Sequence, residues 1–290
     1  MAVDVFHFFK ITYAEGVIEK FQTKKSLGQH FLNSPMVPRW LCEAGEVKEG
    51  DIIVEVGPGT GALTAELLES GAKVVALEAD LRAVEILKER FLGEVSSGQL
   101  KIWHTDVRRF DTADLKLSNH SFKVVSNIPY YLTGQLFRTF LSGNIQPSLL
   151  VFLVQKEVAK RATAALSRGE KESLLSLSIQ AFGTPRYVKT VSRGHFTPPP
   201  KVDSAIIAVH NINQNNFKNL STDQFFEILH LGFGSKRKQL VGNLSKKYER
   251  EKVLEALNVV DLPENVRAED VLMEKWLQLA LILAKISKND

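Results

Sequence analysis

From residue 51 onward, short apolar runs rich in β-branched residues alternate with stretches of helical periodicity. Each apolar run has the length of one buried strand, and the runs are DIIVEVG (51–57), AKVVALEAD (72–80), LKIWHTDV (100–107), FKVVSN (122–127) and SLLVFLVQ (148–155). Over 62–70 and 81–91, apolar residues recur at intervals of three and four, which is the spacing of an amphipathic helix. Strands that alternate with helices predict a parallel sheet with helices on both faces.

Two later strands are expected to finish this sheet in the opposite direction. RYVKTVSRG (186–194) and SAIIAVHNI (204–212) are separated by HFTPPPKVD (195–203), which is too short and too rich in proline to contain a crossover helix. Strands joined in this way pair antiparallel. We therefore predict an α/β fold with a Rossmann-like sheet that is mainly parallel and carries one antiparallel strand.

The pattern changes at the polar, asparagine-rich stretch NINQNNFKNLSTD (211–223). After it the periodicity is entirely helical, over the segments 224–233, 236–248, 249–259 and 273–286. We therefore expect a sheet domain over residues 1–212, with 1–23 as a loosely attached arm, and a small all-α domain over 213–290.

Composition narrows the class of protein. The 290 residues are 44% hydrophobic, enough to bury one large core and a smaller second one. The single cysteine, Cys42, excludes an internal disulfide framework and a cysteine-cluster metal site, which fits a reducing compartment. No apolar run approaches the roughly 20 residues of a membrane-spanning helix. We expect a cytoplasmic monomer with no membrane segment and no metal.

A glycine-rich turn follows the first predicted strand. VEVGPGTGALT (54–64) places Gly57, Gly59 and Gly61 between that strand and a helix, where glycines permit positive φ and a close approach of a ligand to the backbone. The third glycine comes one residue too early for the GxGxxG fingerprint of dinucleotide-binding proteins, which disfavours NAD. A turn made tight only for packing would have the same glycines.

Two carboxylates follow the next two strands. Glu78 ends the second strand, where an acidic residue accepts hydrogen bonds from ribose hydroxyls, and Asp106 follows the third, where it could accept one from an adenine amino group. Either residue alone could be a solvated carboxylate. Together with the glycine turn they surround the carboxyl ends of adjacent strands, where open α/β sheets bind ligands. This set favours a nucleoside cofactor without a pyrophosphate, and S-adenosylmethionine is the commonest such ligand.

The fourth strand ends in NIPYYLT (127–133). Because the residue before a proline is held extended, Ile128 and Pro129 form a stiff turn beside Asn127. The Asn127 carbonyl oxygen and a backbone carbonyl could accept both hydrogens of an adenine N6 amino group and direct its lone pair toward a methyl donor. Tyr130 supplies a flat face for a base swung out of its stack. The alternative is a strand-terminating turn whose tyrosines pack in the core.

Five segments resemble, in this order, those of the ribosomal RNA adenine dimethyltransferase family: KKSLGQHFLNSP (24–35), EVGPGTGALT (55–64), NIPYYLT (127–133), HFTPPPKVDSA (195–205) and SKRKQL (235–240). The resemblance extends from about residue 24 to the C-terminus. It implies transfer of two methyl groups from S-adenosylmethionine to N6 of each of two adjacent adenosines in the 3′-terminal hairpin of small-subunit (16S) rRNA, during ribosome biogenesis.

The resemblance also implies roles for individual residues. The cofactor contacts would be His30, Leu32, Gly57, Gly59, Gly61, Glu78, Asp106, Val107 and Asn127. The catalytic positions would be Asn127, Pro129, Tyr130 and Phe196, with Tyr130 and Phe196 as the two faces of a sandwich around the target base. His30 stands where many members of the family have asparagine.

Basic residues are concentrated in two segments, although the formal net charge is only +4. Residues 21–39 contain Lys24, Lys25 and Arg39 and no acidic residue. In the segment 234–250, a single glutamate, Glu249, is set against Lys236, Arg237, Lys238, Lys246, Lys247 and Arg250. We predict RNA phosphate contacts at Lys24, Lys25, Lys236, Arg237 and Lys238. For Lys246 and Lys247, a solvated helix face is an equally good interpretation.

Three alternative functions stay open. A related enzyme methylates adenine in large-subunit (23S) rRNA and confers macrolide resistance, but the long FTPPPKVDSA segment and the complete helical domain argue against it. A catalytically silent ribosome-assembly or transcription factor would not need Asn127 and Tyr130 beside Glu78. A small-molecule methyltransferase would not explain the basic C-terminal segment.

Overall fold

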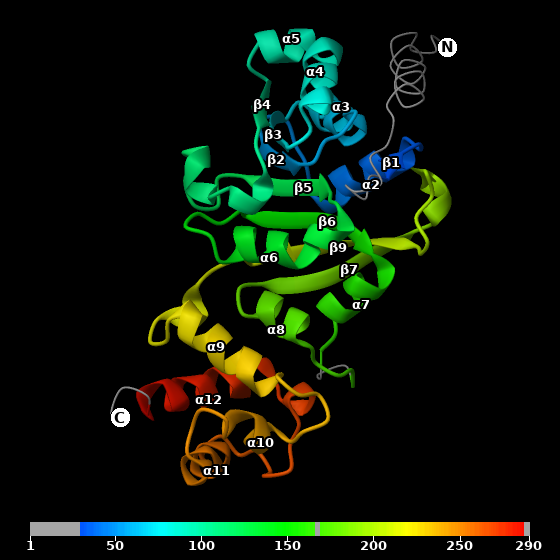
Figure 1. Ribbon diagram of the computed structural model, residues 1–290. Coiled ribbons are helices and arrows are strands. Elements are labelled where there is room, and N and C mark those ends of the chain that lie inside the picture. Colours follow the sequence, from blue (N-terminus) through cyan, green and yellow to red (C-terminus); the bar gives the residue numbers. More distant parts are fainter. Residues whose placement is uncertain (1–29, 166–168, 287–290) are drawn as a thin grey trace. The chain divides into compact units, whose positions relative to one another are not determined.

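The computed structural model describes residues 30–165 and 169–286 (Figure 1). The chain forms two compact units. The first unit contains the residues up to Ala159 together with Arg186–His210, and the second contains Lys160–Pro185 together with the residues from Asn211 onward. The chain therefore passes between the units three times.

The sheet has seven strands in the order β4-β3-β2-β5-β6-β9-β7. Their bounds are β2 (Ile52–Val56), β3 (Lys73–Glu78), β4 (Leu100–His104), β5 (Lys123–Asn127), β6 (Leu149–Gln155), β7 (Thr184–Val191) and β9 (Ser204–His210). The five strands from β4 to β6 pair parallel, and β9 pairs antiparallel with β6. The predicted fold class is confirmed, and β7 and β9 are neighbours as expected.

The helices between and beside these strands flank the sheet (Figure 1). They are α2 (Met36–Ala44), α3 (Ala62–Glu69), α4 (Leu81–Arg90), α5 (Leu92–Ser96), α6 (Thr133–Leu141) and α7 (Lys156–Ala162). The inner strand β6, between β5 and β9, is buried along nearly its whole length, as expected for a strand covered on both faces. Leu41 of α2, Leu67 of α3 and Leu87 of α4 are fully buried in the same hydrophobic cluster as the strand residues Ile53 and Val74.

Two short strands form a separate antiparallel pair, β1 (Phe31–Leu32) with β8 (Phe196–Thr197). Phe31 lies opposite Thr197 and Leu32 opposite Phe196, and the amide of Asn33 donates to the carbonyl of His195 over 3.1 Å. The pair brings together two segments that lie far apart in the sequence and that both carry predicted site residues.

The second unit contains α8 (Leu174–Gln180), α9 (Thr222–Gly232), α10 (Leu240–Leu244), α11 (Arg250–Val259) and α12 (Met273–Ile286). Trp276 of α12 is fully buried and stacks on Phe233 with 5.7 Å between ring centroids. A Cβ atom on Gly232 would lie 2.4 Å from the Trp276 ring, so this contact requires glycine. Within the described ranges, no helix combines the length and the apolar character needed to cross a bilayer.

The division of the chain differs from the expected boundary at residue 212. Residues 160–185 were assigned to the sheet domain, but they belong to the helical unit. The reason is aromatic packing, because the Phe182 ring lies 5.1 Å from that of Phe217 and 6.0 Å from that of Phe226. In addition, the amide of Asn213 donates to the carbonyl of Phe182 over 2.8 Å.

The helix predicted over 236–248 is shorter than expected. Only Leu240–Leu244 is helical, and Gln239 before it is extended, with φ −63° and ψ 154°. The side-chain amide of Asn243 donates to the carbonyls of Gly232 (2.6 Å) and Ser235 (3.0 Å). These bonds hold the residues before Gln239 as a turn, which was not evident from the periodicity.

Candidate active site

A cavity opens in the first unit where β2, β3, β4 and β5 end. Ten of the predicted site residues line it: His30, Leu32, Gly57, Gly59, Glu78, Asp106, Val107, Asn127, Pro129 and Tyr130. Gly61 and Phe196 are not part of its lining. Apart from these two, the structure brings together in one cavity the residues predicted to bind a nucleoside cofactor and those predicted to hold the acceptor base.

The glycine turn between β2 and α3 requires glycine for two different reasons. Gly57, Gly59 and Gly61 all have positive φ, of 66°, 58° and 83°. A Cβ atom on Gly61 would lie 2.6 Å from the Phe91 ring and 2.8 Å from Leu87, so Gly61 permits the helix start to pack against α4. The prediction of Gly61 as a direct cofactor contact is therefore not supported, because it faces the core and not the cavity.

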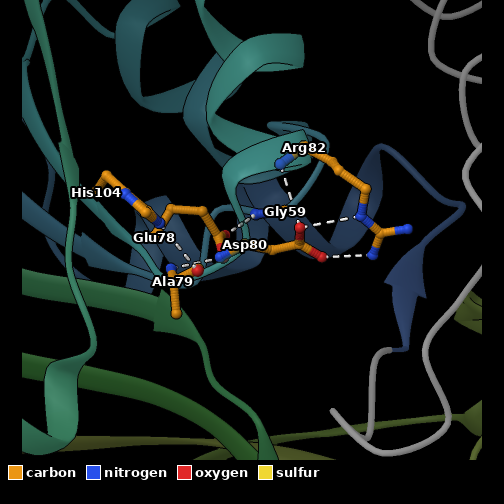
Figure 2. A network of polar contacts seen from close by, with 6 residues as sticks. All are labelled: Gly59, Glu78, Ala79, Asp80, Arg82 and His104. Carbon is orange, nitrogen blue, oxygen red and sulfur yellow. Dashed lines mark hydrogen bonds and ion pairs between the residues drawn. The ribbon is translucent and has the colours of Figure 1, made fainter.

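Glu78, the last residue of β3, is held by three backbone amides (Figure 2). One carboxylate oxygen accepts from Gly59 over 3.1 Å, and the other accepts from Ala79 and Asp80 over 2.8 Å each. Burial raises the pKa of Glu78, and these hydrogen bonds oppose that rise. Because a carboxylate offers about four acceptor positions, one is left on Oε2, which accepts a single bond from a described residue.

Asp106, after β4, is held by an arginine. The Arg108 Nε lies 2.9 Å from both carboxylate oxygens and Nη2 lies 2.6 Å from Oδ2, and Oδ1 also accepts from the Arg108 amide at 3.0 Å. These side-chain bonds lower the pKa of Asp106, which is therefore ionised. An adenine amino group at this carboxylate would share it with Arg108, which also lines the cavity.

Arg108 was not predicted from the sequence, and neither was a second aspartate–arginine pair of the same kind. Asp80 accepts from the Arg82 side chain, with 3.0 Å to Nε and 2.5 Å to Nη2 (Figure 2). The signal was present in the sequence, because Asp-x-Arg follows both the second and the third strand at Asp80 and Asp106. Each aspartate accepts from the backbone amide two residues later and so caps the turn that begins there.

Glu55 was also missed, although it lines the cavity. It lies within β2, is only 2% exposed, and accepts a 2.7 Å hydrogen bond from the Thr64 hydroxyl. Burial raises its pKa to about 8, and the nearby Glu78 carboxylate contributes to the rise. The signal was a carboxylate two residues before the first glycine, inside an otherwise apolar strand.

Asn127 and Tyr130 lie where β5 ends. Among the residues that the structure describes, none forms a hydrogen bond with the Asn127 side chain, so its amide is available to a ligand in the cavity. Pro129 is extended, with φ −60° and ψ 126°, and it leads into the 3₁₀ turn η4 (Tyr130–Leu132). The Tyr130 hydroxyl lies 2.6 Å from the Ser204 hydroxyl, and Tyr130 lines the cavity instead of packing in the core.

The ring beside Tyr130 is not the one predicted. His30 stacks on Tyr130 with 5.9 Å between centroids and 27° between planes. Its Nδ1 donates to the Pro198 carbonyl over 2.8 Å, because a carbonyl can only accept. Phe196 is 2% exposed and belongs to the hydrophobic core, since its side of β8 faces inward beside Leu32. In this structure Phe196 therefore offers no face to a base.

The predicted RNA contacts fall in two places. Lys24 and Lys25 lie outside the described residues. Lys236, Arg237 and Lys238 are exposed in the turn before α10, and across the described ranges they form no ion pair. Lys247, in contrast, is paired with Glu227. No cluster of His, Cys, Asp and Glu suited to a metal ion occurs in the described part of the chain.

Comparisons with known proteins point in one direction. The sequence model described as "Ribosomal RNA adenine dimethylase" matches residues 20–285. A protein of Dehalococcoides mccartyi named ribosomal RNA small subunit methyltransferase A is 37% identical over 263 residues, covering 90% of this chain and 88% of its own. A chloroplastic ribosomal RNA small subunit methyltransferase of Arabidopsis thaliana is 31% identical over 277 residues, covering 90% of this chain and 79% of its own.

Solved structures agree on the fold. A dimethyladenosine transferase from Plasmodium falciparum superposes with a TM-score of 0.72 at 25% identity, covering 89% of this chain and 98% of its own. The 23S rRNA methyltransferase ErmE superposes with a TM-score of 0.65 at 24% identity, covering 88% and 99%. The second likeness concerns the fold alone.

Proposed function

Because the chain belongs to the ribosomal RNA adenine dimethylase family, we propose that it transfers methyl groups from S-adenosylmethionine to N6 of two adjacent adenosines in the 3′-terminal hairpin of small-subunit rRNA. The observation that best supports this proposal is that Gly57, Glu78, Asn127 and Tyr130 line one and the same cavity. The names of the relatives, which specify the small ribosomal subunit, favour this substrate over large-subunit RNA.

The residues of the cavity fit S-adenosylmethionine, which supplies an electrophilic methyl group on a cationic sulfonium. Gly57 and Gly59 leave the backbone open to its methionine part, Glu78 retains an acceptor position for its ribose, and Asp106 offers acceptor oxygens to its adenine. The carboxyl groups of Glu78 and Asp106 line the cavity, and carboxylates at this position suit a cationic ligand better than an anionic pyrophosphate.

Asn127 would prepare the acceptor nitrogen. An adenine N6 group has two N–H donors and a lone pair that is delocalised into the ring. If the Asn127 carbonyl oxygen and a backbone carbonyl of the Ile128–Pro129 turn accept the two hydrogens, the lone pair is directed at the methyl group. The nitrogen becomes cationic during transfer and loses its proton afterwards, so no general base is required.

The test is methyl transfer itself. Undermethylated small subunits and labelled S-adenosylmethionine are incubated with the protein, and the modified nucleotides are mapped. We expect label at N6 of the two adjacent adenosines, and we expect Asn127→Ala to abolish transfer while it still binds the cofactor. Label on large-subunit RNA would overturn the substrate assignment, and full turnover of Asn127→Ala would overturn the role of Asn127.

The exposed turn Lys236–Lys238 would hold the RNA backbone. Its three cations lack ion-pair partners among the described residues, and such groups displace counterions when they bind phosphates. Reversing all three to glutamate should flatten the slope of log affinity against log salt by about 3. Lys247→Glu, in which the replaced cation is one already paired with Glu227, is the matched control and should change the slope less. An unchanged slope in the triple variant would show that these three side chains are solvated and do not contact RNA phosphates.

We further propose that the protein acts as a monomer in the cytoplasm. Every described residue that lines the cavity belongs to the first unit of one chain, and the chemistry proposed above uses no residue from a second copy. Sedimentation of the purified protein tests the first part, and a dimer as the only active species would contradict it.

A further inference from the structure

We propose that Ser204 is a positioning residue: its hydroxyl holds the Tyr130 ring in the orientation on which the target adenine stacks. The inference rests on the proposed function and adds a residue to which neither the sequence patterns nor the comparisons gave a role. It depends on one contact, the 2.6 Å separation between the Tyr130 and Ser204 hydroxyl oxygens.

Ser204 is a fixed point in the sheet. It is the first residue of β9, it is fully buried, and it lies opposite Gln155 in the antiparallel pairing with β6. Within the described ranges, its hydroxyl has only one side-chain partner, Tyr130. The buried Ser204 hydroxyl is therefore directed at a residue of the cavity, and among the described side chains it bonds to Tyr130 only.

Tyr130 needs such a fixed point because its own element does not hold the ring. It begins the single turn η4, in which the Leu132 amide donates to the Pro129 carbonyl (2.9 Å) and the Thr133 hydroxyl to the Tyr130 carbonyl (2.8 Å). Both bonds hold backbone atoms, so the χ1 rotamer of the ring is set by contacts of the side chain itself. A bond at the far end of the ring selects one well, and a stacked base is sensitive to that choice.

The same segment of chain supports the second ring. Pro198 accepts the hydrogen bond from His30, whose ring stacks on Tyr130. Residues 196–204 thus hold both members of the stack, one through a carbonyl and one through a hydroxyl. This gives the FTPPPKVDS sequence a physical role at the cavity, even though its aromatic residue, Phe196, is buried.

The experiment is a double-mutant cycle on the full chain, with undermethylated small subunits and S-adenosylmethionine as substrates. Ser204→Ala and Tyr130→Phe each remove the same hydrogen bond, and we expect each to lower kcat about five- to tenfold. Because the bond is shared, the double variant should lose no more than either single variant. Cofactor affinity, measured by calorimetry, should stay unchanged in all three.

A matched pair in the same unit serves as the control. The Tyr187 and Thr190 hydroxyls lie 2.7 Å apart at an exposed position that does not line the cavity. Tyr187→Phe and Thr190→Ala should leave kcat at the wild-type value. If Ser204→Ala does not fold, Tyr130→Phe alone tests the inference. It removes the same hydrogen bond by changing Tyr130, which is only half-buried, and it leaves the fully buried Ser204 in place.

Two results would overturn the inference: wild-type kcat in a folded Ser204→Ala or Tyr130→Phe variant, or losses that multiply in the double variant. Tyr130→Ala separates this failure from that of the proposed function. If Tyr130→Ala is inactive while Ser204→Ala is fully active, only the positioning role is lost. If Tyr130→Ala is fully active, the stacking role of Tyr130 is wrong.

Discussion

Glu78 and Asp106 bring a carboxylate to the same cavity from neighbouring strand ends, β3 and β4, but the two are held by different kinds of group. Glu78 is 7% exposed and accepts from three backbone amides, one of them in the glycine turn. The Asp106 side chain is 32% exposed and is held by Arg108, whose side chain is 60% exposed. The Glu78 carboxylate is held by the backbone of the turn that it stabilises. The Asp106 carboxylate belongs to an ion pair that is in contact with solvent.

A third carboxyl group, that of Glu55, extends this comparison, and its ionisation should have the largest effect, which is on stability. Glu55 is as buried as Glu78 but accepts only one hydrogen bond from a described residue, and its pKa is raised to about 8. Since the folded state favours the protonated form, the stability from this group is complete below the unfolded pKa, near 4.5. It is lost as pH rises toward 8, by an amount on the order of 4 kcal/mol.

The measurement is the free energy of unfolding of the cofactor-free protein between pH 5 and 9. Wild-type stability should fall across this range relative to Glu55→Gln, which cannot ionise. Glu85→Gln, at an exposed position of α4, is the control and should follow the wild type. Parallel curves for the wild type and Glu55→Gln would mean that Glu55 titrates as an ordinary carboxyl.

Removing Glu78 should have the next largest effect. Glu78→Ala leaves three backbone amides without their acceptor and removes the proposed ribose contact, which together should weaken S-adenosylmethionine binding by about 3 kcal/mol, or roughly 100-fold. Calorimetry of cofactor binding measures this loss. Affinity within a factor of three of the wild type would contradict both the ribose assignment and the structural role of this carboxylate.

Asp106 should matter less, because its charge is already compensated by Arg108 and is partly screened by solvent. Asp106→Asn keeps an acceptor oxygen but loses the ion pair, and we expect the Kd for S-adenosylmethionine to rise about three- to tenfold. The same calorimetric titration compares it directly with Glu78→Ala. An effect as large as that of Glu78→Ala would show that exposure does not separate the two carboxylates.

Local pattern was enough to predict the features that depend on neighbours in the sequence. Strands β2, β5, β6 and β9 were recognisable as apolar runs because both of their faces are buried. Glu78 and Asn127 were identified because each ends a strand. Features that depend on distant partners could not be predicted. Gly61 faces the ring of Phe91, and the pairing of β8 with β1 turns Phe196 into the core.

The difference between local pattern and distant partners also explains why one helix was predicted too long. Periodicity alone predicted a helix over 236–248, but the Asn243 side chain bonds to carbonyls eight and eleven residues earlier and holds a turn there. His30 was predicted to contact the cofactor, and it does line the cavity. Its stacking on Tyr130 depends on a carbonyl 168 residues away, at Pro198, and no local pattern encodes such a contact.

The assignment of Lys160–Pro185 to the helical unit limits how this protein can be dissected. A fragment that ends at residue 212 would retain Phe182 without the aromatic partners Phe217 and Phe226. A fragment that starts at residue 213 would lack Phe182 and the whole of α8. Grafting the C-terminal helices onto another methyltransferase would therefore require two separate insertions, and the evolutionary exchange of this unit by a single recombination event would leave both products with an incomplete core.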